Sequence, residues 1–140
     1  MLVVVDTEYL KGRIEEVRQV IREVERLASK PYSDLSLDEK YALRYHIVVL
    51  VEALGSICLH ISMEGFGHEP RSYPECFKLL DEKGLIDCSE DLVKMGRLRN
   101  ILVHRYWSID DAKVYDSVKR NFKCVERLIE SVEERYGIRA

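Results

Sequence analysis

The sequence contains few residues that interrupt helices, with three prolines and seven glycines among 140 residues. So few helix-breaking residues favour a few long helices over a fold of short strands and tight turns. Internal repeats, linkers and low-complexity segments are absent, and no strand pattern appears beyond the valines at positions 3–5. The composition, 46% hydrophobic and 34% charged, is typical of a soluble globular domain. We therefore expect residues 1–140 to form a single all-α domain with a buried core.

Signals for export and for disulfide bonds are also weak. The opening MLVVVDTEYL has a short apolar run with no basic residue before it, so the sequence predicts no signal peptide and a cytoplasmic protein. The four cysteines form no Cys-x-x-Cys pair: Cys58, Cys76, Cys88 and Cys124. In that compartment we expect reduced, mostly buried thiols with no part in function.

The chain has no overall positive charge, since 22 Lys and Arg residues against 25 Asp and Glu residues leave a net charge of -3. Domains with a broad nucleic-acid surface are usually strongly basic, so the sequence argues against such a surface. One window differs, because no acidic residue occurs between Asp91 and Asp110. The basic residues in that window are Lys94, Arg97, Arg99 and Arg105. This local cationic segment is compatible with a phosphate site.

Five segments repeat apolar residues every three or four positions, which predicts an up-and-down bundle of about five helices. The predicted N-caps are Thr7, Ser36, Ser89 and Asp110, with a capping box at Ser36–Glu39 and a proline-led helix starting near Tyr73. The expected ends lie near residues 30, 62, 84, 107 and 136.

The second predicted helix is apolar nearly all round between Ile47 and Ile61. This pattern marks a central core helix, a dimer seam, or both. We expect no membrane span, because the stretch is shorter than the ~20 residues a bilayer needs and carries Glu52 at its centre.

A metal site is not predicted. His60, Glu64 and His68 are spaced by four residues, but Gly65 and Gly67 interrupt the helix that would align them. A glycine-rich phosphate loop is absent as well, since the only glycine pair lacks the required lysine.

The densest set of reactive side chains is the segment 99–106, RNILVHRY. An arginine can hold a phosphate through its planar fork, and a histidine can move a proton near neutral pH. On a helix Asn100 and His104 share a face, so the amide could orient the imidazole. We expect four neighbours to face inward: Leu98, Ile101, Leu102 and Val103. Spacing alone leaves two interpretations open, a phosphodiester-cleaving site or a polar helix end.

The motif resembles a known family. Arg99, four intervening residues, His104 and Tyr106 match the Arg-x4-His-x-Tyr motif of HEPN-domain proteins of the HepT type. The segment 73–84 (YPECFKLLDEKG) and the five-helix order are also similar, so the likeness covers nearly the whole chain. This resemblance implies a HEPN-like homodimer that acts as a metal-independent endoribonuclease, without a cofactor, as the toxin of a type VII-like toxin–antitoxin pair.

The resemblance also implies roles for the motif residues. His104 would be the general acid or base at the ribose 2′-hydroxyl or leaving oxygen, and Arg99 would stabilise charge on the phosphate. Asn100 would support them. Other contacts to the RNA substrate would come from Lys94, Arg97 and Arg105, of which Arg105 is unusual for the family.

The implied antitoxin is an MntA-like nucleotidyltransferase that transfers AMP to Tyr106 and joins the homodimer, with higher hetero-oligomers possible. The alternative interpretation is a non-catalytic helical partner of a nucleotidyltransferase. Related domains of that kind generally lack the Arg–His pair that is intact here.

Overall fold

The computed structural model describes residues 5–138 and contains five α-helices and no strand over that range. The helices are α1 (Thr7–Ala28), α2 (Leu37–His60), α3 (Tyr73–Glu82), α4 (Ser89–His104) and α5 (Asp111–Tyr136). Short turns of other helix types are η1 (Tyr32–Asp34), η2 (Ile61–Gly65) and η3 (Tyr106–Ser108). The all-α prediction is confirmed, while positions 3 and 4 of the opening valine run lie outside the described residues.

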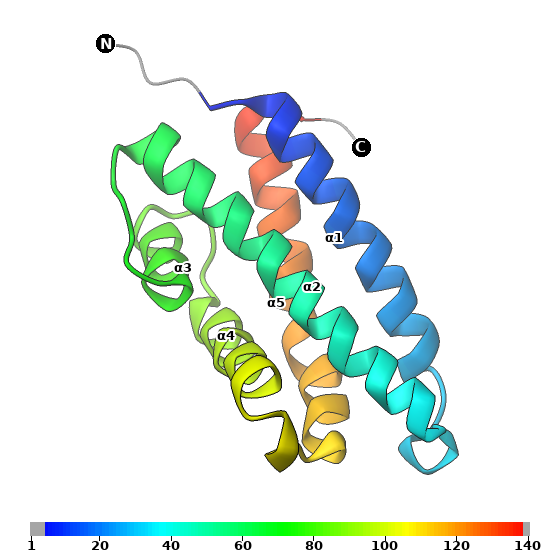
Figure 1. The fold of residues 1–140 in the computed structure, drawn as a ribbon. Coiled ribbons are helices and arrows are strands. Elements are labelled where there is room, and N and C mark those ends of the chain that lie inside the picture. The colour runs from blue at the N-terminus through cyan, green and yellow to red at the C-terminus, as the bar shows by residue number, and fades with distance from the viewer. Residues whose placement is uncertain (1–4, 139–140) are drawn as a thin grey trace.

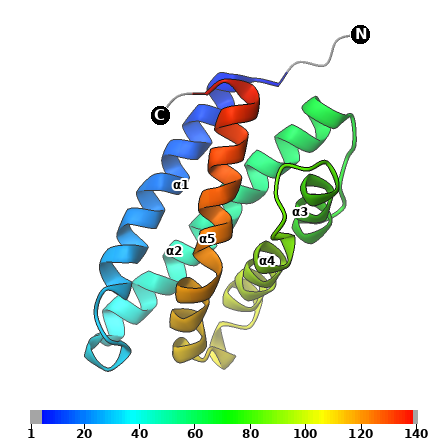
Figure 2. The same cartoon turned by 180° about the vertical axis from the view of Figure 1, so that it is seen from behind.

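The three long helices α1, α2 and α5 form one side of the bundle (Figure 1). The shorter α3 packs against α2 and α4, and α4 packs against α2 and α5. The view from behind shows α5 between α1 and the α3–α4 pair (Figure 2). The described ends of the chain lie at the same end of the bundle. The motif segment therefore begins on α4, in the part of the bundle that α3 and α4 form.

Helix α2 occupies the centre of the bundle, as its apolar sequence predicts. It supplies several of the largest fully buried side chains: Leu43, Ile47, Leu50, Leu54 and Ile57. Together α2 and η2 form a helix whose length and composition would suffice to cross a membrane, but 56% of its most apolar window is buried. Such burial is what the core helix of a folded bundle displays.

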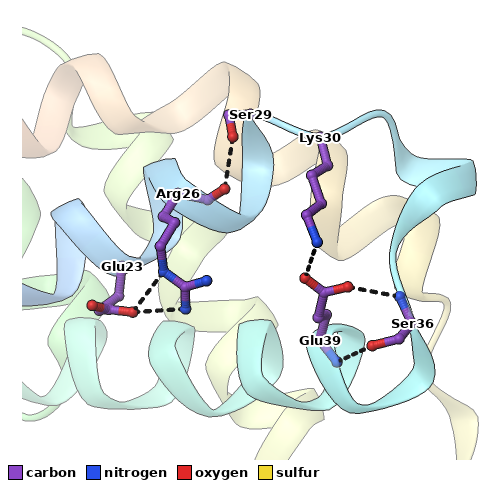
Figure 3. Close-up of polar contacts among 6 residues, drawn as sticks. All are labelled: Glu23, Arg26, Ser29, Lys30, Ser36 and Glu39. Carbon is purple, nitrogen blue, oxygen red and sulfur yellow. Dashed lines mark hydrogen bonds and ion pairs between the residues drawn. The ribbon is translucent and has the colours of Figure 1, made fainter.

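The connection between α1 and α2 is fixed by side chains (Figure 3). The Ser36 hydroxyl accepts from the Glu39 backbone N–H at 3.1 Å, and the Glu39 carboxylate accepts from the Ser36 N–H at 3.0 Å, which confirms the capping box. Lys30 donates to the same carboxylate at 2.7 Å. These contacts lower the pKa of Glu39 to about 2, mainly through the Lys30 hydrogen bond and then the Ser36 N–H.

Two predicted N-caps are wrong by one residue. Asp6 caps α1, since its carboxylate accepts from the Tyr9 N–H at 3.1 Å, and Thr7 is already helical. Cys88 occupies the cap position of α4, and Ser89 begins that helix. The caps predicted at Ser36 and Asp110 are confirmed.

The prediction of reduced cysteines is also wrong. Cys58 of α2 is bonded to Cys76 of α3, and Cys88 before α4 is bonded to Cys124 of α5. The Cα atoms of the pairs lie 6.0 and 5.9 Å apart, which suits a disulfide. Burial is as expected for three of these residues, Cys58, Cys76 and Cys124. The pairings arise from helix packing across 18 and 36 positions, which the spacing in the sequence does not reveal.

Candidate functional site: the C-terminal half of α4

The part of the motif from Arg99 to His104 lies on the last turns of α4, where the helix presents one side to the core and the other to solvent. Leu102 is buried and Leu98 half-buried, as predicted. The prediction is wrong for Ile101 and Val103, which are each 39% exposed. A helix turns ~100° per residue, so the inward stripe takes the i, i+4 pair of leucines and leaves its neighbours outside.

Arg99 is held by two neighbours. Its Nη2 forms an ion pair with Oε1 of Glu52 on α2, and its Nη1 donates to Oδ1 of Asn100 at 2.9 Å. The Arg99 side chain is only 23% exposed. The expected hydrogen bond between Asn100 and His104 is not found among the described residues, where the Asn100 side chain accepts from Arg99 instead.

Tyr73, at the start of α3, completes this cluster. Its hydroxyl donates to Oε2 of Glu52 at 3.1 Å. Burial, and then the Glu52 charge, raise the pKa of Tyr73, so the phenol stays protonated and can donate near neutral pH. Its ring lies against Gly55 of α2, where a Cβ would meet ring carbons at 2.4 Å. Only glycine at that position allows the ring to approach α2 so closely.

An open hollow of about 320 Å³ borders this cluster. It is lined by Ser72, Tyr73, Pro74, Gly96, Arg99 and Asn100. The hollow places a cationic guanidinium and an amide in the wall of a depression that solvent can reach. Chemically, it can accept an anionic group such as a phosphate.

His104 is the last residue of α4 and is exposed. After it the backbone leaves the helix at Arg105, and η3 carries Tyr106 and Trp107, which are 66% and 71% exposed. Their rings meet edge to face with centroids 5.3 Å apart. The remaining candidates are exposed too: Lys94, Arg97 and Arg105. The structure thus gathers Arg99 and Asn100 and leaves the other motif residues at the surface of a single chain.

Neither Glu52 nor Tyr73 is predicted from the sequence as part of this candidate site. A signal for Glu52 existed, because it is the only charged residue between Ile47 and Cys58. A carboxylate in an apolar helix needs a partner, which pointed to a cation on a neighbouring helix. Which cation, and the role of Tyr73, depend on helix packing.

The histidines considered as metal ligands have other partners. His60 Nε2 accepts from the Asp6 backbone N–H at 3.0 Å, and His68 pairs with Glu75 at 3.4 Å. Over residues 5–138, no three His, Cys, Asp or Glu side chains are grouped so as to hold a metal ion.

Comparison with known proteins places the chain in a family. The family described as Ribonuclease HepT-like matches residues 12–132. This match covers most of the chain, which therefore belongs to the HepT-like ribonuclease family. No curated protein matches the sequence.

Solved structures share the fold. A crystal structure described as a toxin–antitoxin with AMP-PNP has 22% identity and a TM-score of 0.82, over 91% of this chain and 98% of that one. A tri-AMPylated HEPN toxin of Shewanella oneidensis in complex with an MNT antitoxin has 23% identity and a TM-score of 0.78, over 90% and 97%. The cytosolic protein YutE of Bacillus subtilis, described as of unknown function, has 17% identity and a TM-score of 0.75, over 89% and 88%. The fold is thus that of HEPN toxins.

Proposed function

We propose that this protein is a metal-independent endoribonuclease and the toxin of a type VII-like toxin–antitoxin pair. The observation that carries the proposal is the intact Arg99–His104 pair at the end of α4, with Arg99 anchored beside an open hollow, in a chain of the HepT-like ribonuclease family. RNA is the substrate, because cleavage without a metal uses the ribose 2′-hydroxyl as the nucleophile.

In the proposed reaction the 2′-oxygen attacks the adjacent phosphorus, and the bond from phosphorus to the 5′-oxygen breaks. A base takes the 2′ proton, an acid protonates the leaving 5′-oxygen, and a 2′,3′-cyclic phosphate forms. His104 serves as one of these proton-transfer groups. Arg99 stabilises the charge that builds on the phosphate oxygens. Asn100 supports Arg99 through the hydrogen bond between them.

A homodimer completes the proposed site. The reaction requires a base and an acid, and each chain contributes one His104, so a second copy supplies the other group. Large apolar side chains on the solvent sides of α2 and α4 support this association: Leu37, Tyr41, Tyr45, Leu59, Ile101 and Val103. We propose that these two helices form the seam, and that the two motifs face each other across it.

Substrate contacts in the proposed complex extend beyond the motif. Exposed Lys94, Arg97 and Arg105 supply positive charge along the same helix end. Phosphate contacts of this kind hold RNA without reading its sequence.

The proposed antitoxin is an MntA-like nucleotidyltransferase that transfers AMP to Tyr106. The exposed phenol supports this, since 66% of Tyr106 is accessible, and one similar structure is described as a tri-AMPylated toxin with its antitoxin. Added phosphates would repel RNA from Arg99 and His104, and the adenosine would fill the groove. Higher hetero-oligomers of toxin and antitoxin are part of the proposal.

We also propose a cytoplasmic location, where RNA and such an antitoxin are found. One similar structure is described as a cytosolic protein. The two disulfides run against this location in most organisms, since cytosolic disulfides are rare except in hyperthermophiles.

The test is RNA cleavage by purified protein in EDTA, followed by gel and end-group analysis for 2′,3′-cyclic phosphate. We expect cleavage by the wild type and none by His104→Ala. Equal activity of the two proteins would refute the assignment. Absence of cleavage together with a tight nucleotidyltransferase complex would support the alternative, a non-catalytic helical partner.

A further inference from the structure

A single carboxylate on α2 lies beside the arginine of the motif. Glu52 pairs with Arg99 through Oε1, an atom shielded from solvent although 42% of the side chain is exposed. Shielding a carboxylate oxygen is costly unless a cation or donor compensates. The ion pair with Arg99 supplies that compensation, so each of the two groups restrains the other.

Further contacts restrain both members of the pair. Tyr73 donates to the second oxygen of Glu52 at 3.1 Å, and its ring is fixed against Gly55. Asn100 accepts from the other terminal nitrogen of Arg99 at 2.9 Å. The guanidinium is therefore attached to α2 and to its own helix, and the carboxylate is attached to α3 and α4.

The anchored guanidinium keeps donors for a ligand. Each terminal nitrogen of an arginine carries two N–H groups. One N–H of Nη1 goes to Asn100, and Nη2 faces Glu52. Among the described residues no hydrogen bond takes the second N–H on either nitrogen, and Arg99 lines the adjoining hollow, so in the proposed complex these donors would meet a phosphate there. Glu52 can thus hold Arg99 without occupying all of its binding capacity.

We propose that Glu52 is a positioning residue for RNA cleavage: it fixes Arg99 in the orientation that stabilises the transition state, and Tyr73 fixes Glu52. This inference rests on the proposed ribonuclease function. The opposite role would be an internal competitor that leaves Arg99 when RNA binds. The half-buried Tyr73, packed closely on Gly55, argues against it, because a carboxylate that must move aside would not be held by a rigid neighbour.

The first experiment measures kcat and KM for RNA cleavage by Glu52→Gln, which keeps the size and removes the charge. Because Glu52→Gln removes a charged partner of Arg99, we expect kcat of this variant to fall roughly ten- to a hundredfold. The KM should stay the same or fall, since a negative charge next to an anionic substrate is removed. Tyr73→Phe should lower kcat by about three- to tenfold. Glu126→Gln, an exposed charge on α5, should behave as the wild type.

A second variant separates positioning from a general structural role. In an Arg99→Ala background, adding Glu52→Gln should change kcat no further, because the residue being positioned is gone. An equal loss in both backgrounds would overturn the proposal. So would a rise in kcat of Glu52→Gln, which a competitor predicts, or wild-type kinetics of that variant.

A readout independent of activity keeps the inference distinct from the proposed function. Side-chain ¹⁵N NMR should show a resolved, slowly exchanging Nε–H signal for Arg99, whose Nε is shielded from solvent. That signal should broaden or vanish in Glu52→Gln and persist in Glu126→Gln. Persistence in Glu52→Gln overturns positioning. A wild-type protein that shows the signal and cleaves no RNA refutes the ribonuclease proposal alone.

Discussion

The two reactive residues of the motif sit in opposite environments, although five positions separate them on one helix. Arg99 is mostly enclosed and bound to partners from two elements, whereas His104 ends the helix at the surface. In the proposed reaction, phosphate binding by Arg99 is therefore organised within one chain. Proton transfer by His104 depends, in the same proposal, on groups that RNA or a second copy of the chain supplies. The fold of one chain thus fixes the position of Arg99, whereas the surroundings of His104 in the proposed site depend on assembly.

The largest expected effect tests the two residues side by side. Both His104→Ala and Arg99→Ala should reduce cleavage, by roughly 10²- to 10⁴-fold for the general acid or base and 10²- to 10³-fold for the charge stabiliser. Only Arg99→Ala should also destabilise the fold, by about 1–3 kcal/mol, because Glu52 loses its partner. Gel-based kinetics and urea unfolding of both variants measure this difference. Equal destabilisation would contradict the contrast.

The next largest expected effect is the loss of fold stability when the two disulfides are removed. Loop closure over 18 and 36 positions predicts that each bond stabilises the fold by about 3–4 kcal/mol. Urea unfolding with and without a reductant, and of Cys88→Ser/Cys124→Ser, measures it. Unchanged midpoints after reduction would show that the bonds add nothing. Mass spectrometry of the unreduced protein serves as the control that the bonds are formed.

Tyr106 should be separable from catalysis, since its ring is exposed beyond the end of α4. Tyr106→Phe should retain RNA cleavage within about threefold, because it removes only a hydroxyl from the surface. The same variant should gain no AMP when co-expressed with a nucleotidyltransferase partner, as read by intact mass. AMP found on Tyr106→Phe would place the modification elsewhere.

The smallest effect concerns acid stability at the α1–α2 connection, far from the motif. Glu39 has a folded-state pKa of about 2 against an ordinary value of 4.5. A lowered pKa means that the contribution of this carboxylate is present above pH 4.5 and is lost as the pH falls towards 2. Glu39→Gln should therefore flatten the stability curve over that window without affecting cleavage at neutral pH. A curve parallel to the wild type would be inconsistent with the shift.

The sequence predicted the local features well and the pairings poorly. Helix periodicity, the Ser36 capping box and the central position of α2 follow from residues near one another in the chain. The partner of Arg99 does not, because Glu52 lies 47 positions earlier and reaches it only through packing of α2 on α4. Hydrophobicity alone predicts core positions for Ile101 and Val103, but it does not distinguish a buried apolar residue from an exposed one.

The two disulfides also determine what a protease could separate. A single cut in the loop 66–72 leaves the fragments joined by Cys58–Cys76, and a cut in the mostly exposed stretch 105–110 leaves them joined by Cys88–Cys124. The turn at residues 83–87 lies between the two loops that the disulfides close. One cut there divides the chain into two pieces that no disulfide joins. The helices that carry Tyr73 and Arg99, α3 and α4, are therefore connected to each other covalently only through the backbone of the turn between them.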